Sequence, residues 1–202
     1  MDAKARFARL CGRLAIVDDV SENVWTDLYS RYSESHRHYH NLHHIEAMLV
    51  KMDEVSAGDV AMELAIWFHD VIYDPRARDN EEQSAAFFVT RMGPYLDAML
   101  CCEVLRLILA TDYARPGTGM VDENLIRDID LSILASSPED YTSYAAAVRK
   151  EYAHVTDEDF RKGRMALLKR FLEAPIYQSA SFGSMEKQAR NNIQAEIDSL
   201  AG

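Results

Sequence analysis

The chain has 202 residues, and 48% of them are hydrophobic, which is enough for one domain with a substantial buried core. Its 33 acidic residues outnumber its 22 lysines and arginines, so the formal charge of −11 disfavours binding to a nucleic-acid polymer or to an anionic membrane. The three cysteines are odd in number and form no disulfide or zinc pattern, which favours a protein of the reducing cytoplasm.

Helix signals recur along the sequence, whereas strand signals are weak and no hairpin turn separates alternating apolar runs. Residues 1–20 are amphipathic and charged, which is not the pattern of a signal peptide. Ser21 before Glu22, and Asn80 before Glu81, each have the residue types of a helix N-cap followed by an acidic first turn. These patterns predict an all-α protein.

A helix is predicted from Ala61 to about Ile72. Apolar side chains recur there at helical spacing, and a proline follows soon after. This helix would carry His69 and Asp70 in its last turn. Residues 73–80 are then predicted to form a loop.

The segment 98–110 is the most apolar later run, but Glu103 and Arg106 interrupt it, and it is too short to cross a bilayer. We therefore expect a soluble protein. The glycines and the proline within 114–120 predict a second loop. Neither predicted loop has the character of a domain linker.

Three further helix starts are predicted in the C-terminal part. Ser137 precedes a proline and two acidic residues, Thr156 precedes three acidic residues, and Ser184 lies shortly before Glu186. The predicted organisation is one helical domain, residues 1–202, with a core at about 20–135 and a C-terminal helical extension at 136–202.

Histidines are concentrated in the N-terminal half. Five of the seven lie within residues 35–45, and a sixth, His69, directly precedes Asp70. A divalent cation needs nitrogen and oxygen ligands that converge from separate parts of the chain. His40 and His44 would lie one turn apart on the same face of a helix, so both would reach one site. An exposed polar helix start is the alternative explanation for each histidine taken alone.

Three segments carry a resemblance to a known family. They are Tyr39-His40-Asn41-Leu42-His43-His44, Ala65-Ile66-Trp67-Phe68-His69-Asp70 and Asp128-Ile129-Asp130-Leu131. Their order resembles the H…HD…D signature of HD-domain metal-dependent phosphohydrolases and is similar to the core of class I cyclic-nucleotide phosphodiesterases. Most of the chain resembles a bacterial group known as predicted metal-dependent HD phosphohydrolases. The resemblance implies an HD-domain-like helical bundle.

The resemblance also implies the residues of a site. It places metal ligands at His44, His69, Asp70 and Asp130, and catalytic residues at His40, as the acid, and Asp70. Asp130 is preferred over Asp128 because the family pattern continues with Leu and Ser, as this chain does after Asp130. No histidine lies between His69 and His154, which favours one protein-ligated metal over two. The metal is left open among Mn, Mg, Co, Ni, Zn and Fe.

The implied reaction is hydrolysis of a phosphate ester in a nucleotide or related small metabolite. A metal-activated water would attack phosphorus, and His40 would protonate the leaving oxygen. An arginine presents a planar fork suited to phosphate oxygens. The candidates for binding the substrate phosphate are Arg37, which is ranked first because it lies close to His40, then Arg164 and Arg190.

Glu81 and Asp112 are candidates to orient the imidazoles, although each also suits a plain position at a helix end. Two other functions are compatible with the same ligands. One is an HD-type iron oxygenase, which would need a richer histidine set, and the other is a non-enzymatic helical module that binds a metal or a nucleotide. The sequence leaves open the substrate, the native metal and whether the chain forms a homodimer.

Overall fold

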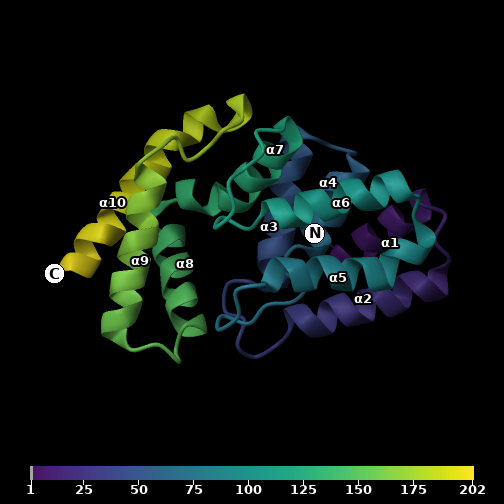
Figure 1. The fold of residues 1–202 in the computed structure, drawn as a ribbon, viewed down its shortest axis with the longest axis horizontal. Coiled ribbons are helices and arrows are strands. Elements are labelled where there is room, and N and C mark those ends of the chain that lie inside the picture. Colours follow the sequence, from purple (N-terminus) through teal and green to yellow (C-terminus); the bar gives the residue numbers. More distant parts are fainter. Residues whose placement is uncertain (1) are drawn as a thin grey trace. The chain divides into compact units, whose positions relative to one another are not determined.

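The computed structural model of the chain describes residues 2–202, and it is helical throughout (Figure 1). Ten α-helices and three short 3-10 helices account for the regular structure of these residues, and no strand occurs among them. The all-α class predicted from the sequence is confirmed. The chain divides into two compact units, one ending at Thr118 and one beginning at Gly119, and each is described by itself.

The first unit contains six α-helices and one 3-10 helix. In chain order these are α1 (Ala3–Arg13), α2 (Asp18–Tyr32), α3 (Leu42–Val55), α4 (Val60–Phe68), α5 (Asn80–Met92), η1 (Gly93–Tyr95) and α6 (Ala98–Ala110). Helix α4 lies at the centre, since it packs against α3, α5 and α6 and every residue from Ala61 to Phe68 is buried. A helix that is apolar on all sides is stable only when neighbours cover it.

Helix α4 ends earlier than predicted. Its last residue is Phe68, and His69 is the C-cap, so the predicted end near Ile72 was wrong. The backbone of Ile72 is taken up by a tertiary contact instead, because its amide donates to the buried Ser84 hydroxyl (3.1 Å), which donates to the Ile72 carbonyl (3.2 Å). His69 and Asp70 therefore lie just beyond the helix rather than inside its last turn.

Helix α3 begins at Leu42, because the Asn41 side chain accepts a hydrogen bond from the His43 amide (2.9 Å) and caps the helix. His40 precedes this cap, so the prediction that His40 and His44 share one helix face was wrong. Two other predicted starts in this unit also shift. Ser21 lies inside α2, and Asp79 rather than Asn80 is the N-cap of α5.

The second unit contains four α-helices and two 3-10 helices. They are α7 (Val121–Asp130), η2 (Leu131–Ala135), α8 (Pro138–Glu151), α9 (Asp157–Leu172), η3 (Ala180–Met185) and α10 (Glu186–Ala201). Helices α9 and α10 lie side by side, and α10 also packs against η2 (Figure 1). Buried Asn192 fixes α10 to η2, since its amide donates to the carbonyls of Leu134 and Ser136, both at 2.9 Å.

Two of the three predicted helix starts in this unit are confirmed. The hydroxyls of Ser137 and Thr156 each accept a hydrogen bond at 3.2 Å from the amide three residues later. The third start was one residue off, because Met185 rather than Ser184 is the N-cap of α10.

The boundary between the units falls within 114–120, a segment that was predicted to be a loop and not a linker. Pro116 and two glycines occupy this segment, and Gly119 has a φ of +81°, a conformation that favours glycine. Helix α7 therefore belongs to the second unit, although its residues were expected within a core of about 20–135. Of the helices in the described part of the chain, none combines the length and apolarity needed to cross a membrane.

Candidate metal centre

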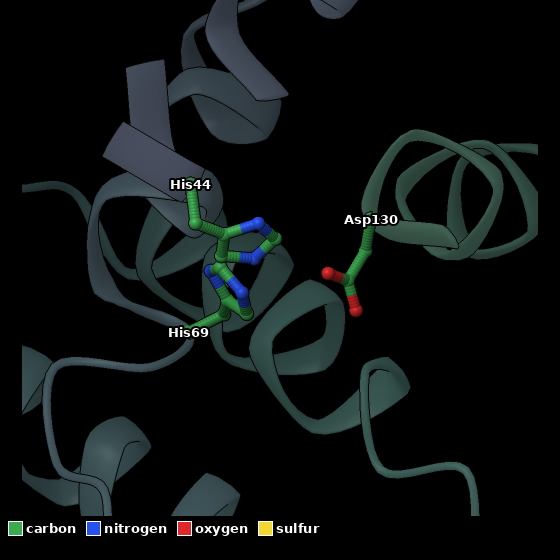
Figure 2. Close-up of side chains that lie close together, drawn as sticks. All are labelled: His44, His69 and Asp130. Carbon is green, nitrogen blue, oxygen red and sulfur yellow. The ribbon is translucent and has the colours of Figure 1, made fainter. Parts of the chain in front are cut away.

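Two buried imidazoles from different helices meet in the first unit. His44 lies in the first turn of α3 and is 5% exposed, and His69 follows the end of α4 and is 1% exposed. Because α3 packs against α4, the ring centroids of the two histidines are 5.4 Å apart, and they offer nitrogens within 4.8 Å of each other (Figure 2). Two of the predicted metal ligands are thereby brought together.

The backbone selects one tautomer of His69. Its Nδ1 lies 3.0 Å from the carbonyl oxygen of Ile66, one turn back along α4. A carbonyl only accepts hydrogen bonds, so Nδ1 carries the proton, and in the neutral ring Nε2 presents a lone pair. A backbone carbonyl that fixes the tautomer in this way is the usual support of a histidine that binds a metal.

The Asp70 carboxylate faces both imidazoles. Its Oδ2 lies 3.1 Å from Nε2 of His69 and 3.8 Å from Nε2 of His44. Metal–nitrogen and metal–oxygen bonds of about 2.1 Å at right angles separate two ligand atoms by roughly 3.0 Å. A lone pair of neutral His69 and a carboxylate oxygen at 3.1 Å repel, so this approach is stable when either a proton on Nε2 or a cation lies between the two atoms. The donor set of the three residues thus fits a divalent cation.

The charge of Asp70 suits this arrangement. Burial alone would raise its pKa, but positive charge on His69, a hydrogen bond from His69 and positive charge on His40 and His44 lower the pKa well below its usual value. The carboxylate is therefore ionised at neutral pH. An anionic oxygen beside two nitrogen donors is a ligand set that many first-row divalent metals accept.

His40 lies beside this pair of histidines without sharing their helix. Its ring stacks on Tyr73 with centroids 4.3 Å apart, and its centroid is 5.9 Å from that of His44. Tyr39 packs on the other side, with ring centroids 5.0 Å from His40 and 4.8 Å from His44. The half-buried His40 imidazole thus has a defined place next to the ligands, and its role as acid stays a prediction.

The three arginines predicted to bind phosphate have other partners. The Arg37 side chain is 0% exposed and donates to backbone carbonyls, including that of Asp70 at 2.6 Å. In the second unit, Arg164 pairs with Glu196 (2.8 Å) and Arg190 with Glu186 (2.6 Å). All three guanidinium groups are bound by other parts of the fold, and their predicted role in binding phosphate stays a prediction. An arginine close to a motif in sequence can serve the fold, which sequence reasoning did not separate from substrate binding.

Two further carboxylates, those of Glu81 and Asp112, were predicted to orient the imidazoles. Burial raises the pKa of Glu81, and the nearby charges of Asp70 and Asp112 raise it further. Asp112 itself accepts hydrogen bonds from the Arg115 side chain (2.9 Å) and the Ala114 amide (2.8 Å). The Asp112 carboxylate thus stabilises the loop that follows it. The role of Glu81 and Asp112 in orienting imidazoles stays a prediction.

Asp130 is the last residue of α7 in the second unit, where it is half-buried, and Figure 2 draws its carboxylate. Asp128, one half-turn earlier, has a structural role: its carboxylate is buried and accepts the amides of Gln178 (3.0 Å) and Ser179 (2.6 Å). The preference for Asp130 over Asp128 is thus compatible with the second unit's own contacts. The assignment of Asp130 as a ligand stays a prediction.

No family model, curated protein or solved structure matches this chain.

Proposed function

We propose that the chain is a metal-dependent hydrolase of phosphate esters, of the HD-domain type, in which His44, His69 and Asp70 hold a divalent cation. The observation that carries the proposal is the approach of the Asp70 carboxylate to two buried imidazoles, at 3.1 Å and 3.8 Å. The hydrogen bond of His69 Nδ1 to the Ile66 carbonyl supports it, because in the neutral ring the nitrogen that faces Asp70 is then the one with the lone pair.

The order of these residues in the chain supports the reaction class. The histidine of α3, the His69-Asp70 pair and a later aspartate follow the order of the phosphohydrolase signature that the sequence resembles. When bound, a divalent cation supplies Lewis acidity toward water and toward a phosphoryl oxygen. Asp130 is the fourth ligand that the resemblance implies.

The chain's own contribution to the reaction is to donate a proton to the leaving oxygen. Cleavage of a phosphate ester leaves an alkoxide-like oxygen, which leaves more easily when a side chain protonates it. His40 is suited to this role, because an imidazole titrates near neutral pH and the ring lies next to His44 without belonging to the pair that faces Asp70. The proposed substrate is a small phosphate ester, of which nucleotides are one class.

Metal uptake and phosphate release test the proposal together. We expect the full-length chain to bind Mn²⁺ or Co²⁺ and to release phosphate from simple esters or nucleotides only in its loaded form. His44→Ala should lose both properties. The matched control is His43→Ala, because His43 is its neighbour in the same helical turn and its side chain is 93% exposed.

Three outcomes would contradict the proposal. If His44→Ala binds metal as tightly as wild type, the cation does not use this site. Metal binding without turnover of any ester indicates the non-enzymatic module. Bound iron with consumption of O₂ indicates the oxygenase.

A further inference from the structure

Arg37 is buried next to the candidate metal centre and joins two segments that carry residues of this centre. Its side chain is 0% exposed. Nη1 donates to the carbonyls of His40 (3.0 Å) and Asp70 (2.6 Å), Nη2 donates to the carbonyl of Val71 (3.0 Å), and Nε donates to the Glu34 carboxylate (3.0 Å). One guanidinium therefore links the segment before α3 to the segment after α4.

These two segments need an external support. His40 lies before the cap of α3, and Asp70 lies beyond the C-cap of α4, so neither residue is inside a helix whose own hydrogen bonds would fix its backbone. The carbonyls of His40 and Asp70 accept from the same nitrogen of Arg37. The separation of their backbones is consequently set by one planar group.

The surroundings of Arg37 favour a fixed guanidinium. Its Cζ atom lies 5.2 Å from the ring centroid of Tyr32 and 5.5 Å from that of Tyr73, and Tyr73 is the ring on which His40 stacks. The Glu34 carboxylate compensates the buried charge. Lysine has no planar fork and cannot serve these acceptors in the same directions.

We propose that Arg37 is a positioning residue of the metal centre: by bonding the carbonyls of His40 and Asp70, it holds the Asp70 carboxylate against the imidazoles of His44 and His69. The inference rests on the proposed function in one respect only, the binding of a cation at this site. Arg37 acts through Asp70 and is not expected to touch the substrate. Residues that orient ligands from outside typically change metal affinity roughly ten- to hundredfold when they are replaced.

Co²⁺ binding to the full-length chain tests the inference. We expect Arg37→Lys to weaken Co²⁺ binding by about tenfold or more in calorimetric titration and to change the visible absorption of the bound ion. The matched control is Arg6→Lys. Arg6 is also a buried arginine of the first unit, and it joins α1 to Glu63 (2.6 Å) of α4 and Asp53 (2.6 Å) of α3 by ion pairs.

Both metal-free variants should unfold at a lower temperature than wild type, but only Arg37→Lys should change the affinity and the spectrum, measured well below either midpoint. Wild-type affinity and spectrum in Arg37→Lys would overturn the inference and leave Arg37 a stabilising role alone. Should Arg37→Lys not fold, Arg37→Gln decides by the same criterion, because its shorter side chain keeps a planar amide donor but does not join the carbonyls of His40 and Asp70 as the guanidinium does.

The wild-type chain separates this inference from the proposed function. If it binds Co²⁺ and hydrolyses no ester, the proposed reaction is contradicted while the result for Arg37 stands. If it binds no divalent cation, both are contradicted.

Discussion

The His69 imidazole is defined on both sides of its ring. The Ile66 carbonyl fixes the proton on Nδ1, and Nε2 faces the Asp70 carboxylate. Adjacent positions in the sequence thus supply two different donors to one point, because His69 is the C-cap of α4 and the chain turns directly after it. A His-Asp dipeptide is common in protein sequences. The proton on Nδ1 of His69 and the approach of its Nε2 to Asp70 are what suit this one to a metal.

His40 is expected to act on the leaving group and not on the metal. Replacing it, as in His40→Asn, should lower the turnover of a phosphate ester by about 10²–10⁴-fold, the usual contribution of a general acid. Co²⁺ affinity should stay at the wild-type value, measured by calorimetry. His38→Asn is the control, since His38 is exposed and lies two positions away. Loss of metal by His40→Asn would make His40 a ligand instead.

The sequence offers two aspartates for the fourth ligand, and paired variants distinguish them. Asp130→Asn should lower Co²⁺ affinity with little change in the melting temperature. Asp128→Asn should lower the melting temperature and leave Co²⁺ affinity unchanged, because the Asp128 carboxylate holds the amides of Gln178 and Ser179. The reverse pattern, read by calorimetry and thermal unfolding, would assign the ligand to Asp128.

At the scale of elements, helix starts with a side-chain cap were the easiest to predict. Ser137 and Thr156 combine a capping hydroxyl with acidic residues in the first turn, and both cap α-helices as expected. Ser21 carries similar neighbours but lies inside α2, where it is buried. The local sequence indicates where a cap is possible, whereas the packing of the helix determines the residue at which the helix begins.

The N-cap of α8 should contribute a measurable part of the free energy of unfolding. Ser137→Ala removes the acceptor of the Asp140 amide and should cost about 1 kcal/mol in the free energy of unfolding. Ser143→Ala is the matched control in the same helix, because the exposed Ser143 hydroxyl only donates to the Glu139 carbonyl. Chemical denaturation measures both. Equal losses would mean that the capping bond contributes nothing specific.

Acid should loosen the segment between α9 and η3 through Glu186. Burial would raise its pKa, but the amides of Ile176 and Tyr177 and the Arg190 side chain lower it below the usual value. A carboxylate with a lowered pKa stabilises the fold above its unfolded pKa of about 4.3, and this contribution disappears as the pH falls through the folded pKa.

Glu186→Gln should therefore be less stable than wild type at pH 7, and the difference should shrink below about pH 4. Thermal unfolding as a function of pH measures this difference. Glu158→Gln, at an exposed position in the first turn of α9, is the control and should follow the wild-type curve. A difference between Glu186→Gln and wild type that is independent of pH would contradict the role of the ionised carboxylate.

At the scale of the whole molecule, each unit has its own core. In the first unit, Trp67 of α4 makes edge-on contacts with Phe7 of α1 and Trp25 of α2, with ring centroids 5.6 Å and 6.0 Å apart. Apolar burial of this kind supplies most of the stability of a helical domain. Helix α4, which His69 directly follows, is thereby held by contacts that lie outside the site.

A buried ion pair adds to this frame. Arg6→Met leaves the Glu63 carboxylate, 7% exposed, without its closest cation, which should cost about 3–5 kcal/mol in the free energy of unfolding. Arg9→Met, at an exposed position of the same helix, should change the stability little. Urea denaturation compares the two. Equal effects would show that the pair contributes no more than a surface arginine.

The sequence by itself determined the helical class, because apolar periodicity and caps are local properties of the chain. The family resemblance of its motifs also indicated His44, His69 and Asp70, and the structure brings these three residues together in the first unit. The tertiary structure decided what local signals do not contain. Helix α4 ends at Phe68, the unit boundary lies at 118–119, and Arg37 donates to backbone carbonyls. Each of these three features depends on contacts between residues far apart in the chain.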